Sequence, residues 1–307
     1  MKKTTGLIAA PPTAFRGDGT VDMAAVAPLA EHLQRQGVAG VFINGTTGEG
    51  MSLTVAEREQ LAAEWRRALP RGLKLFVHVG HNCGEDAAAL ARHAQKIGAD
   101  AVGSLAPGFF KPGGIPALTD WCAPVAAAAP DLPFYFYHMP SMNGVHLNIA
   151  RFLEYARPRI PTLAGIKYTF ETMGDYLDAL SFADGRYDVL WGRDEMLLGA
   201  LALGARGAVG STYNIAGPLF RKLMAAFDRG DLAAARALQL QAVRFINVMV
   251  QGPNFFAVLK AVLQAQGVPI TTITRSPLPP FSGETAADLA RRCVEVIGGN
   301  NESDGSV

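Results

Sequence analysis

One lysine of the sequence ends an apolar run that has the length of a buried strand. The run extends from Leu163 to Lys167, and Tyr168 and Thr169 follow it. Burying an ammonium group without a partner is costly, so such a lysine reaches water, finds a carboxylate or loses its proton. A lysine that is neutral at the working pH is a nucleophile that condenses with ketones to form a Schiff base. The alternative is a strand-end lysine whose ammonium group reaches solvent, and this stretch taken alone favours that alternative.

A turn rich in glycine and threonine follows another strand-like run. The turn extends from Asn44 to Gly50 and places Thr46 and Thr47 between glycines. Hydroxyl groups beside free backbone N–H groups suit a carboxylate or another small oxyanion. The alternative is an ordinary glycine turn.

Polar side chains also follow three further strand-like runs. Tyr137 and His138 end one run, Asp194 and Glu195 follow a second, and Ser211 ends a third. A tyrosine in such a place is more often a core residue with a satisfied hydroxyl. The two carboxylates could equally cap the amino terminus of a helix.

Taken together, these groups fit chemistry on a 2-oxo acid. The threonine turn would hold the carboxylate, and Lys167 would attack the neighbouring ketone. Tyr137 would carry protons to and from the substrate oxygens. The iminium would then act as an electron sink, so that the carbon–carbon bond one atom further out could break or form. We therefore expect an enzyme that needs no cofactor.

The sequence contains two alternatives to chemistry at Lys167. Lys111 is the serious rival among the lysines, because it lies on a loop that follows the strand-like run Ala101–Leu105. A metal-dependent aldolase would need a ligand set, and His78, His81 and His138 lie near strand ends. These histidines have no tight ligand spacing and no carboxylate at a matching strand end, so we expect no metal. The other lysines are poorer candidates. Lys74 begins its strand, at the end opposite to the expected site, and three lysines lie in helices: Lys96, Lys222 and Lys260.

Short apolar runs alternate with helix-like stretches over about 230 residues. Several runs are apolar at consecutive positions, as is typical of parallel strands that are covered on both faces. The predicted strands are Gly6–Ala10, Val38–Asn44, Lys74–Val79, Ala101–Leu105, Phe134–His138, Leu163–Lys167, Asp188–Trp191 and Ala208–Ser211. The predicted helices between and after them are Met23–Gln36, Val55–Ala68, Glu85–Ile97, Pro116–Ala128, Asn148–Tyr155, Gly174–Phe182, Glu195–Leu203 and Gly217–Asp228.

Eight such units indicate an α/β fold, the (β/α)₈ TIM barrel, whose active site forms at the carboxyl ends of the strands. A doubly wound sheet is the alternative, but it would show a glycine fingerprint after its first strand. Three more helices, Leu232–Val250, Phe255–Gln266 and Glu284–Ile297, predict a helical appendage. We therefore expect a barrel over residues 1–230, the appendage over 231–298 and a disordered polar tail over 299–307. Pro28 should kink the first helix or shift its start.

The composition argues against two classes of binding partner. The formal net charge is +1, from 28 basic and 27 acidic side chains without a long run of either, which argues against nucleic acid and anionic membranes as partners. No segment has the roughly 18 uninterrupted apolar residues of a membrane span. The three cysteines, Cys83, Cys122 and Cys293, are far apart, which favours reduced thiols. We expect a soluble cytoplasmic protein.

The motifs resemble those of the pyruvate-dependent Schiff-base lyase and synthase superfamily, which includes N-acetylneuraminate lyases and dihydrodipicolinate synthases. The resemblance runs from Gly6 to about Pro280. The marks shared across the superfamily are the turn Gly45–Glu49, Tyr137 before a proline turn, and Gly165-Ile166-Lys167. The sequences Tyr137–Pro140, Gly192–Glu195 and Gly210–Asn214 look like the N-acetylneuraminate lyase branch.

The resemblance implies a role for each site residue. Lys167 would be the Schiff-base lysine, Tyr137 the proton carrier, and Thr46 and Thr47 the ligands of the substrate carboxylate. Five further residues would line the pocket for the polyhydroxyl tail of a sialic acid: Thr169, Gly192, Asp194, Glu195 and Ser211. The small-molecule partners would be pyruvate and sialic acid, and the assembly a homotetramer.

Four residues depart from relatives. Met142 stands where dihydrodipicolinate synthases have an arginine for the second substrate, which argues against that branch. Phe109 and Phe110 stand where many relatives place a tyrosine that reaches the neighbouring subunit, and Arg193 adds a positive charge to the tail pocket. Three other functions stay open: a lyase or dehydratase of another 2-keto-3-deoxy sugar acid, a dihydrodipicolinate synthase-like condensation, and a non-catalytic barrel that binds a 2-oxo acid.

Overall fold

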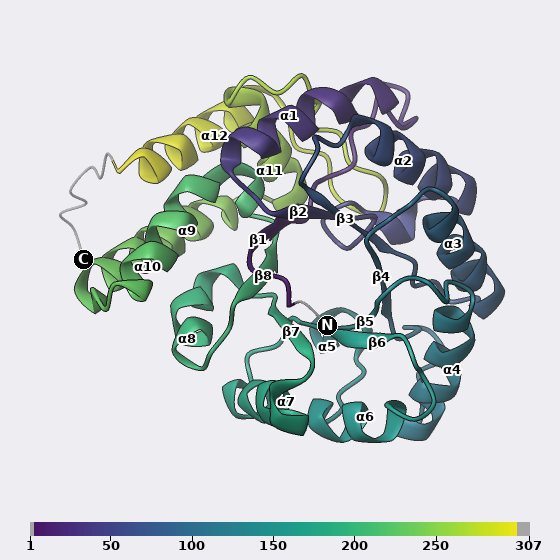
Figure 1. The fold of residues 1–307 in the computed structure, drawn as a ribbon. Helices are drawn as coiled ribbons and strands as arrows, with labels where there is room; N and C mark the ends of the chain where they lie inside the picture. Colours follow the sequence, from purple (N-terminus) through teal and green to yellow (C-terminus); the bar gives the residue numbers. More distant parts are fainter. Residues whose placement is uncertain (1–2, 300–307) are drawn as a thin grey trace.

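Eight parallel strands close into a barrel in the computed structural model, which describes residues 3–299 (Figure 1). Each strand pairs with the next in the sequence, and β8 pairs with β1 to close the sheet. The TIM-barrel prediction is therefore confirmed. The strands are β1 (Gly6–Ala9), β2 (Gly40–Ile43), β3 (Lys74–His78), β4 (Ala101–Leu105), β5 (Phe134–His138), β6 (Leu163–Tyr168), β7 (Asp188–Trp191) and β8 (Gly207–Gly210).

The helices of the barrel lie around the outside of the strands (Figure 1). They are α1 (Val26–Gln36), α2 (Val55–Ala68), α3 (Gly84–Lys96), α4 (Ile115–Ala127), α5 (Pro140–Asn143), α6 (Ile149–Ala156), α7 (Met173–Gly185), α8 (Leu197–Ala202) and α9 (Tyr213–Asp228). Short 3₁₀ helices precede α1, α2 and α8: η1 (Met23–Ala25), η2 (Gly50–Ser52) and η3 (Asp194–Met196). No helix among residues 3–299 is both long and apolar enough to cross a membrane.

Strand pairing places two of the predicted site residues side by side. Tyr137 on β5 is the register partner of Lys167 on β6, near the carboxyl end of both strands. The strands are buried almost throughout, as their consecutive apolar residues predict. Side chains inside the barrel form a separate small core that includes Phe42 and Tyr135 together with Tyr137. This packing fixes the positions from which the site residues extend.

Two helices of the barrel begin at other residues than the sequence predicts. Residues Met23–Ala25 form a 3₁₀ turn, and the α-helix begins only at Val26, so that Pro28 lies in its first turn, where a missing N–H costs little. The helix predicted from Gly217 begins earlier, at Tyr213, but its backbone leaves helical geometry at Ala216, just before the predicted start. The short helix α5 was not predicted, because four residues are too few to show periodicity.

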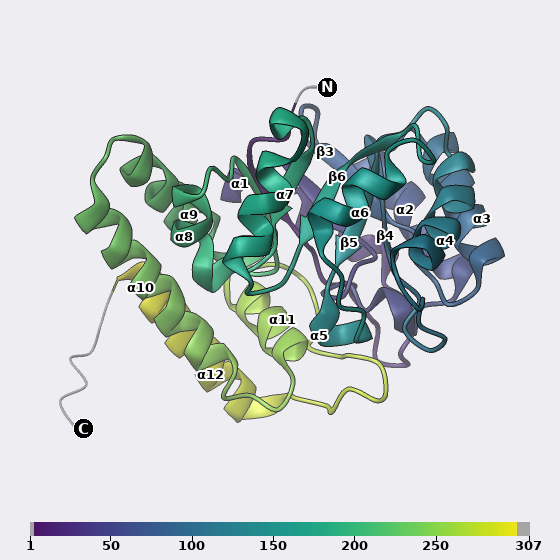
Figure 2. The ribbon, with the colours of Figure 1, turned by 90° about the horizontal axis from the view of Figure 1, so that it is seen from below.

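Three helices follow the barrel: α10 (Leu232–Met249), α11 (Phe255–Ala265) and α12 (Gly283–Gly298). Helix α10 packs against α9 and α12, and α11 packs against α12. Figure 2 shows α11 near α5, at the end of the barrel opposite the amino terminus. The division at residues 230 and 231 stays a prediction, and the predicted disordered tail, apart from Gly299, lies outside the described residues.

Candidate active site

A cavity of about 320 Å³ opens at the carboxyl ends of the strands. All nine predicted site residues line this cavity: Thr46, Thr47, Tyr137, Lys167, Thr169, Gly192, Asp194, Glu195 and Ser211. They come from the ends of five different strands and the loops that follow. The structure therefore brings together residues that are up to 165 positions apart in the sequence, from Thr46 to Ser211.

Lys167 lies on the inner side of the barrel with only 4% of its surface exposed. Its Nζ is 4.1 Å from the centre of the Phe42 ring and 4.0 Å from that of Tyr137. Burial disfavours the charged ammonium and lowers the pKa of Lys167 from 10.5 to about 7, although the Asp194 carboxylate acts in the opposite direction. A substantial fraction of the amine is therefore neutral, and hence nucleophilic, near neutral pH.

The Tyr137 hydroxyl lies between the threonine turn and a methionine. It is 3.4 Å from Thr46 Oγ1 and donates to Met139 Sδ over 2.8 Å. Burial raises the pKa of Tyr137 to about 12, and the Thr46 hydroxyl opposes this rise. The phenol is therefore protonated at neutral pH, so it can donate a proton or pass one between two oxygens.

The threonine turn is a tight loop with unusual backbone angles. It is closed by bonds from the Gly50 N–H to the Gly45 carbonyl (3.0 Å) and from the Glu49 N–H to the Thr46 carbonyl (3.0 Å). Asn44 and Glu49 have positive φ angles of 57° and 52°, which residues other than glycine rarely adopt. This geometry points both threonines into the cavity.

Thr169 and Gly192 form the next part of the wall. An added Cβ at Gly192 would overlap the Thr169 hydroxyl, so this position needs a glycine. Thr169 Oγ1 is buried near the Tyr137 hydroxyl but has no hydrogen-bond partner of good geometry among the described residues. Buried hydroxyls are normally paired, so this oxygen is free to bond a group in the cavity.

The two adjacent carboxylates, Asp194 and Glu195, occupy different environments. Asp194 is 5% exposed, and its Oδ2 accepts from the N–H (2.9 Å) and the hydroxyl (2.6 Å) of Thr212. Burial raises the pKa of Asp194 to about 6, and the bonds from Thr212 oppose the rise. Asp194 is thus fixed to the β8 end and electrostatically coupled to Lys167, which the sequence did not indicate.

Glu195 is more exposed and belongs to an ion-pair group at the rim. Its Oε1 is 3.3 Å from Arg193 Nε, and Arg193 also pairs with Glu171. The positive charge of Arg193 is therefore shared between two carboxylates. Both carboxylates lie in the first turn of η3, where negative charge is favourable, but the N-cap residues of η3 and α8 are Arg193 and Met196 and neither makes a side-chain capping bond.

The alternatives to Lys167 lie outside this arrangement. Lys111 is exposed on the loop after β4 and does not line the cavity. His78 is buried, with its Nδ1 donating to the Asn44 carbonyl over 3.0 Å, and His81 pairs with Asp86 over 3.4 Å. Within residues 3–299, no three His, Cys, Asp or Glu side chains gather closely enough to hold a metal ion.

Several residues of the site were missed by sequence reasoning. Met139 accepts hydrogen bonds from both Tyr137 and Thr46, yet a methionine after a strand carries no chemical signal. The appendage also contributes part of the cavity wall, with Ile246, Val250, Phe255 and Phe256. Lys260, which the sequence merely places in a helix, is fully buried and paired with Glu49. Only the tertiary structure brings these residues to the barrel mouth.

The arrangement can perform imine chemistry on a 2-oxo acid. A neutral amine, a protonated phenol and a hydroxyl-bearing turn converge at one end of the cavity, as nucleophile, proton carrier and oxyanion site. The rest of the cavity lining includes carboxylate and hydroxyl groups that can bond to a polyhydroxyl chain.

Comparison with known proteins agrees with this geometry. The chain is 40% identical over 290 residues to N-acetylneuraminate lyase of Mus musculus, covering 93% of this chain and 90% of that protein. It is 39% identical over 296 residues to N-acetylneuraminate lyase of Danio rerio, covering 95% of this chain and 96% of that protein. The solved N-acetylneuraminate lyase (sialic acid aldolase) of Aliivibrio salmonicida superposes with a TM-score of 0.92 at 39% identity, over 98% of each chain. The solved N-acetylneuraminate lyase of Proteus mirabilis superposes with a TM-score of 0.92 at 36% identity, over 96% of this chain and 99% of that chain. A match to the Dihydrodipicolinate synthetase family covers residues 3–295, and the chain belongs to this family.

Proposed function

We propose that this protein is a Schiff-base aldolase that cleaves N-acetylneuraminate to N-acetylmannosamine and pyruvate through Lys167. The observation that carries the proposal is the buried Lys167 amine beside Tyr137 and the Thr46–Thr47 turn. The polar wall that follows β6, β7 and β8 supports a polyhydroxyl substrate. Relatives of nearly full length that are named N-acetylneuraminate lyase support the same substrate.

The reaction follows from the groups present. The neutral Lys167 amine adds to the ketone carbon, and loss of water gives an iminium. The bond one carbon further out then breaks, its electron pair moves into the iminium to form an enamine, and the hydroxyl on the leaving fragment gives up its proton. The enamine carbon takes a proton, and water hydrolyses the imine to release pyruvate and the free amine. The Tyr137 hydroxyl carries the protons, and Thr46 and Thr47 hold the carboxylate.

Met142 supports the choice of substrate. Its side chain lies at the rim of the cavity and is largely exposed. A thioether is at most a weak acceptor and cannot hold a second carboxylate, such as that of aspartate semialdehyde. The carboxylates Asp194 and Glu195 would instead accept bonds from sugar hydroxyls.

Two assays test the proposal. Borohydride reduction in the presence of pyruvate is expected to fix one adduct per chain on Lys167, located by peptide mass spectrometry. Pyruvate release is expected from N-acetylneuraminate within a panel of keto-deoxy sugar acids. An adduct on Lys111, or no adduct, would contradict the assignment of the nucleophile. Release from a shorter keto-deoxy acid alone would replace the proposed substrate.

We infer further that the protein is a cytoplasmic homo-oligomer, with a homotetramer as the proposed state. Phe109 and Phe110, on the loop after β4, are 78% and 84% exposed. Two adjacent exposed aromatic rings favour burial against another surface. Cys83, Cys122 and Cys293 are free thiols, which suits a reducing compartment.

A further inference from the structure

Glu49 belongs to the threonine turn but does not line the cavity. It has a positive φ angle and a side chain that is almost completely buried. A non-glycine residue keeps such a conformation only where its surroundings hold it. The contacts that hold Glu49 therefore also determine where Thr46 and Thr47 lie.

The first contact is a buried ion pair with the appendage. Lys260 Nζ of α11 donates to Glu49 Oε1 over 2.7 Å and to the Ile273 carbonyl over 2.6 Å. The side chains of Glu49 and Lys260 are 1% and 0% exposed. A buried ion pair contributes little net stability compared with apolar residues of similar size, so its use here points to a positional role.

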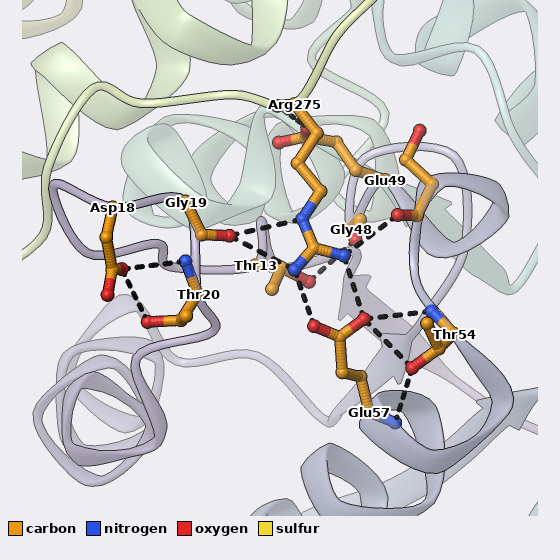
Figure 3. A network of polar contacts seen from close by, with 10 residues as sticks. Thr13, Asp18, Gly19, Thr20, Gly48, Glu49, Thr54, Glu57 and Arg275 are labelled. Atoms are coloured by element: carbon orange, nitrogen blue, oxygen red, sulfur yellow. Dashed lines mark hydrogen bonds and ion pairs between the residues drawn. The ribbon is translucent and has the colours of Figure 1, made fainter.

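The second contact is with the segment after α11. The backbone N–H of Arg275 donates to Glu49 Oε2 over 2.8 Å. The Arg275 guanidinium fastens this segment to the barrel rim: it donates to Glu57 Oε1 (2.5 Å) and Oε2 (2.8 Å) and to the Ser52 carbonyl (2.9 Å). It also donates to the Gly19 carbonyl over 3.1 Å. Figure 3 shows Arg275 above Glu57, with Glu49 and Gly19 on either side.

The other members of this network are themselves fixed. Glu57 caps α2 through the Thr54 N–H over 2.9 Å, and Thr13 Oγ1 donates to the Gly48 carbonyl over 2.6 Å (Figure 3). Pairing with Arg275 lowers the pKa of Glu57 to about 2, so this carboxylate stays charged at any working pH. The appendage is thus attached to a rigid part of the barrel rim.

We propose that Glu49 is a positioning residue for the carboxylate site, and that Lys260 and the Arg275 segment hold it there. Both carboxylate oxygens of Glu49 are bonded, one to each partner. This arrangement fixes the turn at Glu49 and aims Thr46 and Thr47 at the substrate. The appendage thereby serves the binding of every 2-oxo acid, whatever its tail. The inference rests on the proposed imine chemistry.

The change that tests it is Glu49→Gln. Glutamine keeps the size of the side chain but replaces one acceptor oxygen with an NH₂ group, which cannot accept from both Lys260 and the Arg275 N–H. Weaker placement of the turn reduces binding of ground state and transition state alike, so KM should rise while kcat stays nearly unchanged. We expect the half-saturating pyruvate concentration for borohydride trapping to rise about 10-fold or more, in line with loss of a charge-assisted hydrogen bond. The kcat for N-acetylneuraminate should stay within about threefold.

A matched control separates positioning from stability. Asp188 is a buried carboxylate at the opposite end of the barrel and accepts from the Thr4 N–H (3.0 Å) and the Tyr135 hydroxyl (2.9 Å). Asp188→Asn should lower the thermal midpoint without changing the half-saturating pyruvate concentration. If Glu49→Gln behaves in the same way, with trapping within twofold of the unaltered protein, the inference is overturned.

Two further variants test the inference even if Glu49→Gln fails to fold. Glu49→Gln with Lys260→Met leaves no unpaired charge buried, and Arg275→Ala changes a side chain that is 22% exposed. Both should remain folded and should raise the half-saturating pyruvate concentration. Failure of all these variants to fold would also overturn the inference, because the network would then serve the fold as a whole. Absence of trapping in the unaltered protein would instead refute the proposed function.

Discussion

At the scale of single residues, the proposed chemistry requires a lysine whose amine is neutral near neutral pH. Lys167 lies against the rings of Phe42 and Tyr137, which exclude water from its ammonium group. Its pKa of about 7 results from this burial, and the Asp194 charge keeps it from falling further. Aromatic faces attract a cation only weakly, so they do not replace the lost hydration.

This environment predicts the pH dependence of imine formation. Below a pKa of about 7, Lys167 is protonated and cannot attack a ketone. The rate of borohydride trapping at subsaturating pyruvate should therefore fall about tenfold per pH unit below 7 and level off above it. Trapping reactions quenched at set times between pH 5 and 9, and quantified by intact-protein mass spectrometry, would measure this rate. A midpoint near 10 would show that the amine keeps the pKa of an exposed lysine.

Tyr137 provides the second prediction at this scale. Tyr137→Phe removes only a hydroxyl that bonds to Met139 and lies beside Thr46, so the fold should be retained. Loss of a positioned proton carrier should lower kcat about 10²–10⁴-fold. Steady-state pyruvate release, together with the thermal midpoint, would measure both effects. Turnover close to that of the unaltered protein would assign the proton transfer to another group.

At the scale of elements, the loops after β7 and β8 act as a unit. Thr212, which follows β8, bonds to Asp194, which follows β7, while Glu195 pairs outward with Arg193. Two adjacent residues of one loop thus have different partners, and we expect them to have different functions. A joint replacement of both carboxylates would not separate binding of the tail from the chemical step, because Asp194 influences Lys167.

Isosteric single replacements should separate the two functions. Asp194→Asn removes the charge that raises the pKa of Lys167, so the midpoint of the pH profile for pyruvate trapping should move below about 7. Glu195→Gln should leave that midpoint unchanged and raise KM for N-acetylneuraminate. Trapping profiles and steady-state kinetics on both variants would measure this. Equal midpoints in the two variants would contradict the coupling of Asp194 to Lys167.

At the scale of the whole molecule, the appendage contributes to the cavity wall and the outer surface carries an exposed aromatic pair. Helices α10 and α11 supply apolar side chains to the cavity wall and, through Lys260, a contact with the threonine turn. The ring centres of Phe109 and Phe110 are 4.9 Å apart in a perpendicular arrangement, and both rings lie largely in solvent.

The pair predicts a measurable association. Replacing Phe109 and Phe110 together by serine should shift the protein towards smaller species in sedimentation velocity, because the apolar area available for burial is lost. Leu240→Ser, on α10 at 49% exposure, is the matched control and should leave the distribution unchanged. An unchanged distribution in the double variant would place the contact surface elsewhere.

The sequence by itself determined the barrel and the chemical identity of the site. Parallel strands buried on both faces require consecutive apolar residues, and a barrel site requires polar residues at strand ends, so both leave local patterns. For this reason Lys167, Tyr137 and the threonine turn could be identified from their positions in the chain. Pro28 shows the same principle for a helix start, because proline fixes φ and lacks a backbone N–H, and both effects are local.

Only the tertiary structure decided which groups act on one another. Glu49 and Lys260 are 211 positions apart, and nothing in either local sequence indicates the other. The pKa of Lys167 likewise depends on burial against Phe42 of β2, which lowers it, and on Asp194 of η3, which raises it. Burial and electrostatic coupling are properties of the packed environment, because they depend on which groups the fold brings together. They can therefore be determined only from the folded structure, in which the barrel is closed and residues of α10 and α11 line the cavity.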